Sequence, residues 1–262
     1  MRPLSLVWGT TMLLGAVPAL AANEVSLVHA RSIVSNKYGI TVQSAQFDVQ
    51  VAQLGRQQSV SIRHRAADGQ WQTTPLTFSR MLGNGQALWS GSLPNYSTNG
   101  VPGQPMTLDF VVSYQADGRQ YWDDNQRQGY QLAPTAGDVL YGPVVWVTNH
   151  TGSLDQFWGG QYHGSVVLKN LGYHKDVQVV YSTDHWQSQR VAYASYSPSY
   201  WASAYAHTTN PNPAGFEVWS YVLDVGAATA VEYAVRYQVN GQIYWDDNGG
   251  QNHQARLTNR QM

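Results

Sequence analysis

Two copies of one pentapeptide place a flat aromatic ring beside carboxylate and amide groups. The sequence Tyr-Trp-Asp-Asp-Asn occupies residues 121–125 and again residues 244–248. In each copy the tryptophan ring offers an apolar face, while the aspartate and asparagine side chains offer hydrogen-bond acceptors and donors. This combination suits a hydroxyl-rich ring such as a sugar. The alternative is structural: the tryptophan closes the end of a sheet and the polar side chains cap a turn.

The similarity between the two copies extends backwards from each pentapeptide. Residues 108–118 align with residues 231–241 in hydrophobic pattern and in several identities. Self-similarity over this distance indicates two domains of one kind. We therefore expect a first domain at residues 22–133 and a second at residues 139–258, each long enough to enclose its own core. Residues 133–138 have the composition of a short linker.

The tryptophans correspond only in part between the two halves. Alignment places Trp71 opposite Trp186 and Trp89 opposite Trp219. Three further tryptophans occur in the second half alone: Trp146, Trp158 and Trp201. The two copies therefore need not share one function.

Short alternating runs of Val, Ile, Tyr and Phe predict the elements that must position these residues. Period-2 alternation is typical of strands with one buried face. The pairs Asp117-Gly118 and Asn240-Gly241 separate such runs and predict two-residue hairpins, because both central positions need a positive φ. No window has the apolar spacing of a long amphipathic helix. An all-β fold with an antiparallel sandwich in each half follows.

Composition restricts the partners. Charged residues make up 12% of the chain and the formal net charge is −1, so neither nucleic acid nor an anionic membrane is favoured as a partner. Cysteine is absent, which excludes disulfides and thiolate zinc sites. No run after residue 21 is apolar and long enough for membrane insertion. The sequence calls for no cofactor.

The N-terminus has the pattern of a signal peptide. Arg2 precedes the mostly apolar run from Leu4 to Leu20, and Ala19-Leu20-Ala21 has the small-x-small form found before a cleavage site. We expect residues 1–21 to be removed and the protein to be exported. An exported chain without cysteine favours a bacterial periplasmic or secreted protein.

The second half resembles carbohydrate-binding module family 21, which includes starch-binding domains of glucoamylases and glycogen-binding domains of protein phosphatase 1 targeting subunits. The resemblance is carried by residues 166–186, residues 231–248 and Asn252. It implies tandem immunoglobulin-like β-sandwiches that bind α-1,4-glucans or maltooligosaccharides without chemistry of their own. A separate carbohydrate-active enzyme would be a natural partner.

The resemblance also implies two binding sites in the second half. The first would use Trp186, Trp245, Asp247 and Asn252. The second would use Asn170, Tyr173, Lys175, Tyr193, Phe216 and Glu217. In the first half only three corresponding residues remain: Trp71, Trp122 and Asp124.

Several positions depart from the family pattern. Asp247 stands where the family has asparagine, and Ala234 where it often has an aromatic residue. In the first half Gly129 replaces the residue equivalent to Asn252, and Tyr130 corresponds to His253. Gln53, Arg56 and Gln58 replace the asparagine, tyrosine and lysine of the second site. We expect the second half to dominate binding.

Three other classes of function are an enzyme, a calcium-binding protein and an adhesive protein. An enzyme is disfavoured because adjacent aspartates in a strand point to opposite faces, whereas a glycosidase needs two carboxyl groups facing one sugar. Seven histidines are dispersed along the chain without the spacing of metal ligands: His64, His150, His163, His174, His185, His207 and His253. The Asp-Asp-Asn loops are too short to surround a calcium ion. A structural or adhesive protein, with sandwiches that bind other proteins, stays an alternative.

Overall fold

Every regular element of the described chain is a β-strand. The computed structural model describes residues 24–98, 104–148, 157–158, 160–201 and 208–257. All strand pairs within these residues are antiparallel, which confirms the predicted all-β class. The described residues contain no helix that is long and apolar enough to cross a membrane. The predicted signal peptide lies outside the described residues.

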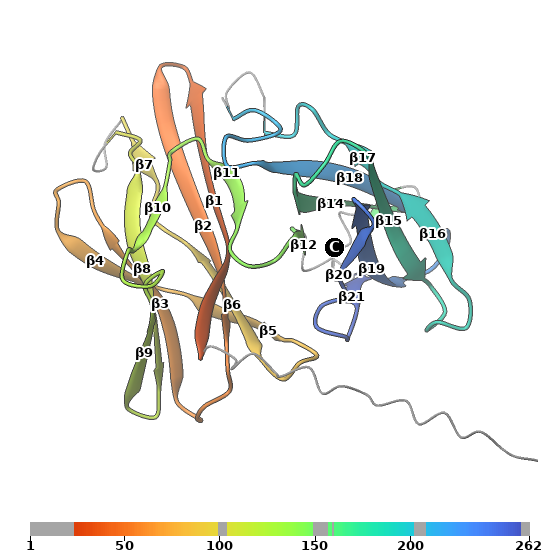
Figure 1. Cartoon of the computed structure of the whole chain (residues 1–262), viewed down its shortest axis with the longest axis horizontal. Coiled ribbons are helices and arrows are strands. Elements are labelled where there is room, and N and C mark those ends of the chain that lie inside the picture. Colours follow the sequence, from red (N-terminus) through yellow and green to blue (C-terminus); the bar gives the residue numbers. More distant parts are fainter. Residues whose placement is uncertain (1–23, 99–103, 149–156, 159, 202–207, 258–262) are drawn as a thin grey trace, which may run out of the picture.

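The first half forms two sheets around one core (Figure 1). Sheet 1 has the order β11-β1-β2-β6-β5, with β7 beside β2. Its strands are β1 (Val25–Lys37), β2 (Ile40–Val51), β5 (Thr77–Met81), β6 (Ala87–Ser92), β7 (Tyr96–Ser97) and β11 (Gly137–Leu140). Sheet 2 has the order β10-β8-β3-β4, with β9 beside β8. Its strands are β3 (Gln58–Arg65), β4 (Trp71–Pro75), β8 (Leu108–Ala116), β9 (Arg119–Asp123) and β10 (Tyr130–Leu132).

The second half forms another pair of sheets around a second core. Sheet 3 has the order β12-β14-β18-β17, with β13 beside β14. Its strands are β12 (Val145–Val147), β13 (Phe157–Trp158), β14 (Gln161–Lys169), β17 (Ser195–Tyr196) and β18 (Phe216–Asp224). Sheet 4 has the order β16-β15-β19-β20, with β21 beside β19. Its strands are β15 (Lys175–Ser182), β16 (Arg190–Tyr193), β19 (Ala230–Val239), β20 (Gln242–Asp246) and β21 (His253–Arg256).

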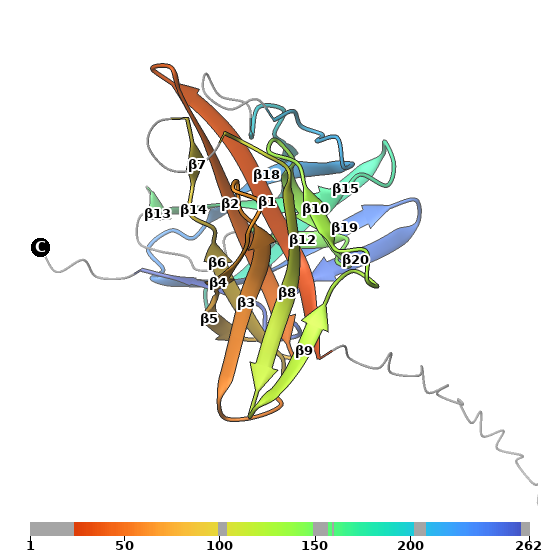
Figure 2. The ribbon, with the colours of Figure 1, turned by 90° about the vertical axis from the view of Figure 1, so that its left-hand side faces the viewer.

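A third apolar cluster joins the two halves. It combines sheet 1 residues such as Val28 and Leu88 with sheet 3 residues such as Val167 and Val218. Trp146 and Trp201, which have no counterpart in the first half, are buried in it. The four sheets therefore stack in the order 2-1-3-4, and Figure 2 looks onto the outer face of sheet 2.

The segment expected to be a linker differs from the prediction. Gly137–Leu140 is the edge strand β11 of sheet 1, where Gly137 pairs with Ser32 and Leu140 with His29. This strand satisfies backbone groups along an otherwise open edge of β1, which a linker would leave to solvent. The first half therefore extends to Leu140, and the strands of the second half begin at Val145.

The two predicted hairpin turns are confirmed. Asp117 and Gly118 have φ values of 44° and 81°, and Asn240 and Gly241 have φ values of 49° and 75°. These turns join β8 to β9 and β19 to β20 in matching registers. Each pentapeptide therefore enters its loop from the same kind of hairpin.

The first aspartate of each pentapeptide connects the two sheets of its sandwich. Asp123 Oδ2 accepts the backbone N–H of Leu27 at 2.7 Å, and Asp246 Oδ2 accepts that of Val147 at 2.6 Å. The other oxygen of Asp123 binds Tyr130 Oη at 2.7 Å. The other oxygen of Asp246 binds His253 Nε2 at 2.9 Å. The same connection between sheets is thus present in both copies.

Removing either carboxylate should destabilise the protein. We expect Asp123→Ala and Asp246→Ala each to lower the free energy of unfolding by about 1–3 kcal/mol, because the backbone N–H of Leu27 or Val147 loses the carboxylate that accepts its hydrogen bond away from bulk water. Urea denaturation followed by circular dichroism measures the change. Asp109→Ala is the control, since its carboxylate binds exposed Gln131, and should stay within about 0.5 kcal/mol of wild type. Equal stability of all three variants would contradict the role of the two carboxylates.

Candidate functional site

The outer face of sheet 4 presents an aromatic residue at each end of one row. Strand register places Trp245 opposite Arg236, Arg236 opposite Gln178, and Gln178 opposite Tyr193. The side chains of Trp245 and Tyr193 are 50% and 69% exposed. Three strand spacings separate them, or about 14 Å. The row therefore has aromatic ends and a polar middle.

The charges in the middle of this row are paired. Arg236 binds Asp176 Oδ2 through Nη1 at 3.2 Å, and Gln178 Nε2 donates to the same oxygen at 2.7 Å. Ile243 and Val191 add exposed apolar surface at the two edges of the sheet. The face consequently carries little unbalanced charge.

The loop after Trp245 is held by its own hydrogen bonds. Asp247 Oδ1 accepts the N–H of Gly250 at 2.9 Å, and its carbonyl accepts the N–H of Asn252 at 2.7 Å. Asn248 Nδ2 donates to the carbonyl of Asn252 at 3.1 Å. One carboxylate oxygen of Asp247, predicted to bind ligand, thus fixes the loop as well.

Trp186 lies in a turn after β15. His185 and Trp186 have φ values of 57° and 64°, and the Trp186 N–H donates to Ser182 Oγ at 2.9 Å. Its indole is half-buried, and Nε1 is buried without a partner among the described residues. Ser182 pairs with Glu232, whereas Trp245 lies opposite Arg236, four residues along β19. The structure therefore puts Trp186 and Trp245 at different levels of sheet 4.

The predicted second site is divided between surface and interior. Asn170 and Tyr173 are exposed, the latter by 92%. Lys175 Nζ instead binds Glu217 Oε1 at 3.0 Å, with only 7% of the lysine side chain exposed. Phe216 belongs to the apolar cluster between the halves. Lys175 and Glu217 therefore connect sheets 4 and 3.

Tyr193, which the sequence grouped with the second site, shares its row with Trp245 instead. It lies on β16 opposite Gln178, whereas Tyr173 lies in the connection between β14 and β15. This places Tyr193 on the face that carries the predicted first site.

Two exposed tryptophans also lie on the outer face of sheet 2. Trp122 on β9 lies opposite Ser113, and Trp71 on β4 lies opposite Arg65. The guanidinium groups of Arg63 and Arg65 lie 5.6 and 5.8 Å from the Trp71 ring. Trp71 is a strand residue and Trp186 a turn residue, so their alignment does not hold in space.

The loop that follows Trp122 repeats the geometry of the second copy. Asp124 Oδ1 accepts the N–H of Arg127 at 2.9 Å, and the Asp124 carbonyl accepts that of Gly129 at 2.8 Å. Asn125 Nδ2 donates to the Gly129 carbonyl at 3.0 Å. The loops differ mainly in the side chains that they carry.

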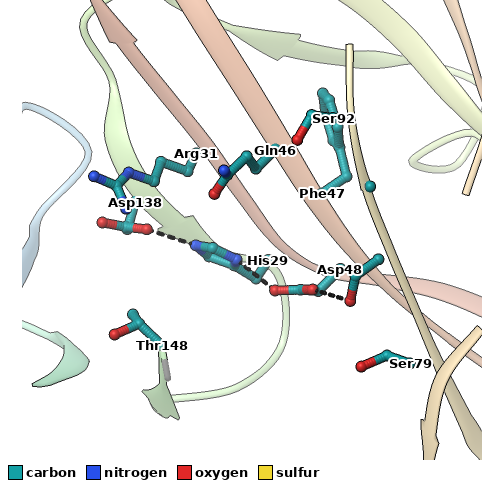
Figure 3. Close-up of a pocket in the computed structure, with 11 residues that line it drawn as sticks. His29, Arg31, Gln46, Phe47, Asp48, Ser79, Ser92, Asp138 and Thr148 are labelled. Carbon is teal, nitrogen blue, oxygen red and sulfur yellow. Dashed lines mark hydrogen bonds and ion pairs between the residues drawn. The ribbon is translucent and has the colours of Figure 1, made fainter. Parts of the chain in front are cut away.

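A chain of buried polar groups, missed by the sequence analysis, borders a hollow of about 360 Å³ (Figure 3). His29 binds Asp48 through Nδ1 at 2.8 Å and Asp138 through Nε2 at 2.7 Å. Ser90 Oγ donates to the other oxygen of Asp48, and Trp201 Nε1 donates to the other oxygen of Asp138. This chain ties β1, β2 and β11 to the second half.

The arrangement of this chain is unlike that of a nucleophile and its base. Both ring nitrogens of His29 are occupied by carboxylates, and Ser90 faces Asp48 rather than the imidazole. A general base needs a nitrogen within reach of the proton that it removes. The geometry therefore supports a structural role.

His29 and Asp138 are both charged at neutral pH. Burial disfavours the imidazolium, but hydrogen bonds to Asp138 and Asp48 and their charges outweigh burial and raise the pKa of His29 from 6.5 to about 9. Burial likewise disfavours the Asp138 carboxylate, yet His29, Arg31 and Trp201 together hold its pKa below 3.8.

Comparison with known proteins connects the second half to a family. Residues 150–256 match the model of the carbohydrate/starch-binding module family 21. Protein phosphatase 1 regulatory subunit 3C of Bos taurus is 29% identical over 34% of this chain and 26% of its own length. Glycogen-binding subunit 76A of Drosophila melanogaster is 33% identical over 34% of this chain and 12% of its own length.

A glucoamylase matches the same region. Glucoamylase 1 of Rhizopus oryzae is 28% identical over 37% of this chain and 14% of its own length. The chain thus spans less than a third of each of these relatives. The solved starch-binding domain of the Rhizopus oryzae glucoamylase, in complex with β-cyclodextrin and maltoheptaose, is 22% identical. It covers 44% of this chain and 95% of its own, with a TM-score of 0.32.

The raised pKa of His29 predicts a loss of stability at alkaline pH. The folded state holds the imidazolium more tightly than the unfolded chain, so its contribution is complete below pH 6.5 and fades as pH rises through 9. We expect a fall on the order of 3 kcal/mol in the free energy of unfolding. His29→Gln should lack this fall, so the two proteins should converge in urea titrations at high pH. If the free energies of unfolding of wild type and His29→Gln instead change in parallel with pH, the stabilising role of the His29 imidazolium is contradicted.

Proposed function

We propose that the protein binds α-1,4-glucan chains on the outer face of sheet 4 and performs no chemistry on them. The observation that carries this proposal is the half-exposed Trp245 at one end of a nearly neutral row, within the residues that match a starch-binding family. An indole ring covers the apolar face of a pyranose, and neighbouring amides bind its hydroxyl groups.

The electrostatics of the face fit a neutral polymer. Arg236 is paired with Asp176, so a bound chain would meet no strong unbalanced charge. Binding should therefore depend weakly on salt. The relatives, which include a glycogen-binding subunit and a glucoamylase, support an α-glucan as the ligand.

The first half is proposed as a related module with weaker binding. Trp122 is exposed, but Gly129 in the adjoining loop offers no side chain where the second half has Asn252. Trp71 lies beside two arginines rather than amides. On this proposal the two modules are the predicted domains, with the first extended to include β11.

We also propose an exported protein that works beside a separate enzyme acting on the same polymer. The apolar residues 4–20 and the absence of cysteine support export. The rival is an adhesive protein that uses the same sandwiches. Retention on immobilised starch or glycogen separates the two, since an adhesive protein would pass unretarded at low ionic strength.

The two pentapeptide tryptophans should contribute unequally. We expect Trp245→Ala to weaken maltoheptaose binding by about 5- to 100-fold, as stacked aromatic contacts do elsewhere. Trp122→Ala, its matched control, should have a much smaller effect. Isothermal titration calorimetry on both folded variants measures the difference. Equal losses would remove the asymmetry, and no loss in either variant would assign both rings to structure alone.

A further inference from the structure

The pentapeptide loop of the second half is docked on the first half. Arg80 Nε donates to Asn248 Oδ1 at 2.7 Å, and the Gly83 N–H donates to the Asn248 carbonyl at 3.1 Å. A Cβ atom on Gly83 would lie 2.0 Å from the Gly249 carbonyl oxygen, so only glycine permits this approach. The β5–β6 hairpin and the loop after β20 lie side by side in Figure 1.

A hollow of about 400 Å³ opens beside this contact and has walls from both halves. Arg80 and Met81 line it from the first half. From the second half it is lined by Asn248, Gln251, Asn252, His253 and Gln254. This volume lies within the range of small-ligand pockets, roughly 300–1,000 Å³.

The chemistry of these walls fits a hydroxyl-rich neutral ligand. Four lining side chains are carboxamides, each of which both donates and accepts hydrogen bonds, and no carboxylate is among the lining residues. Met81 is 41% exposed and supplies an apolar contact. Vicinal hydroxyl groups on an otherwise apolar ring need this mixture.

The hollow opens on the same face of sheet 4 as Trp245. In β21, His253 and Ala255 are buried, so Gln254 points outwards and lies opposite Glu232. Glu232 and Arg236 share one face of β19, and Arg236 is opposite Trp245. A chain that crosses Trp245 can therefore continue towards Gln254.

The hollow also continues along the sheet. Gln254 is shared with a second hollow of about 280 Å³. That hollow shares His185 and Glu232 with a third of about 290 Å³, which reaches Ser182. Together they form a polar trough from the turn that carries Trp186 to the first half.

We propose that the first half completes the glucan site of the second: a linear chain held at Trp245 extends into the hollow lined by Met81, Gln251 and Gln254. This inference rests on the proposed function. The docking contacts fix the hollow before ligand arrives, which reduces the ordering cost of binding. Met81 then contacts the ligand from the first half. The exposed tryptophans of the first half, Trp71 and Trp122, are not needed for this contact.

The test compares chains of different length on the full protein. We expect Met81→Ala to weaken maltoheptaose binding by about 3- to 10-fold and maltotriose binding much less, because a shorter chain held at Trp245 has fewer sugar rings to place in the hollow. Gln251→Ala, on the opposite wall, should behave alike. Phe78→Ala is the matched control, since Phe78 is exposed on the same strand but does not line the hollow.

The outcomes separate this inference from the proposed function. If Met81→Ala and Gln251→Ala match Phe78→Ala while Trp245→Ala weakens binding of both ligands, the extended site is overturned and glucan binding stands. If Trp245→Ala weakens neither ligand, the proposed function fails and the extended site falls with it. Circular dichroism and urea midpoints confirm that each variant is folded.

Discussion

The alternation of side chains along β9 and β20 is the constraint on which the candidate surfaces depend. The first aspartate of each pentapeptide must point inwards, because its carboxylate holds the N–H of Leu27 or Val147 in the opposing sheet. Since neighbours in a strand face opposite sides, the preceding tryptophan must point outwards. The tyrosine before it points inwards again, where Tyr121 stacks on Tyr114 and Tyr244 lies near Tyr237. The hydrogen bond of the aspartate thus fixes the exposure of the neighbouring tryptophan ring. The same peptide both connects the two sheets and contributes to the outer surface.

The two halves share this frame and differ in what surrounds it. Tyr130 and His253 satisfy the same carboxylate oxygen with different chemistry, so the substitution leaves the connection between sheets intact. The loops that follow are closed by equivalent backbone bonds. The second loop also contacts the first half, through Asn248 and Gly249. The two halves therefore have the same connection between their sheets, while the loop of the second half also contacts the first half.

Local sequence patterns were sufficient to predict the strands and the two hairpins that carry the pentapeptides. Alternating apolar residues predicted the strands, and Asp-Gly and Asn-Gly predicted the two hairpins, because these features depend on neighbours in sequence. The failures involve contacts between distant residues. His29 meets partners 19 and 109 residues away, and Arg80 meets one 168 residues away. Lys175 has the same alternation as the buried Val177 and Val179 and therefore points inwards, but its partner Glu217 lies 42 residues later on the facing sheet. No local signal marks Gly137–Leu140 as a strand of sheet 1, because the edge of β1 that it covers lies about a hundred residues earlier in the chain.

The apolar cluster between sheets 1 and 3 has a geometric consequence for a polymer ligand. It stacks the sandwiches so that the outer faces of sheets 2 and 4, with Trp122 and Trp245, are turned away from each other (Figures 1 and 2). A single glucan strand cannot lie flat on both. On the proposed function, each face would bind a strand of its own, and the packing of Val28, Leu88, Val167 and Val218 would set how far apart two such strands are held.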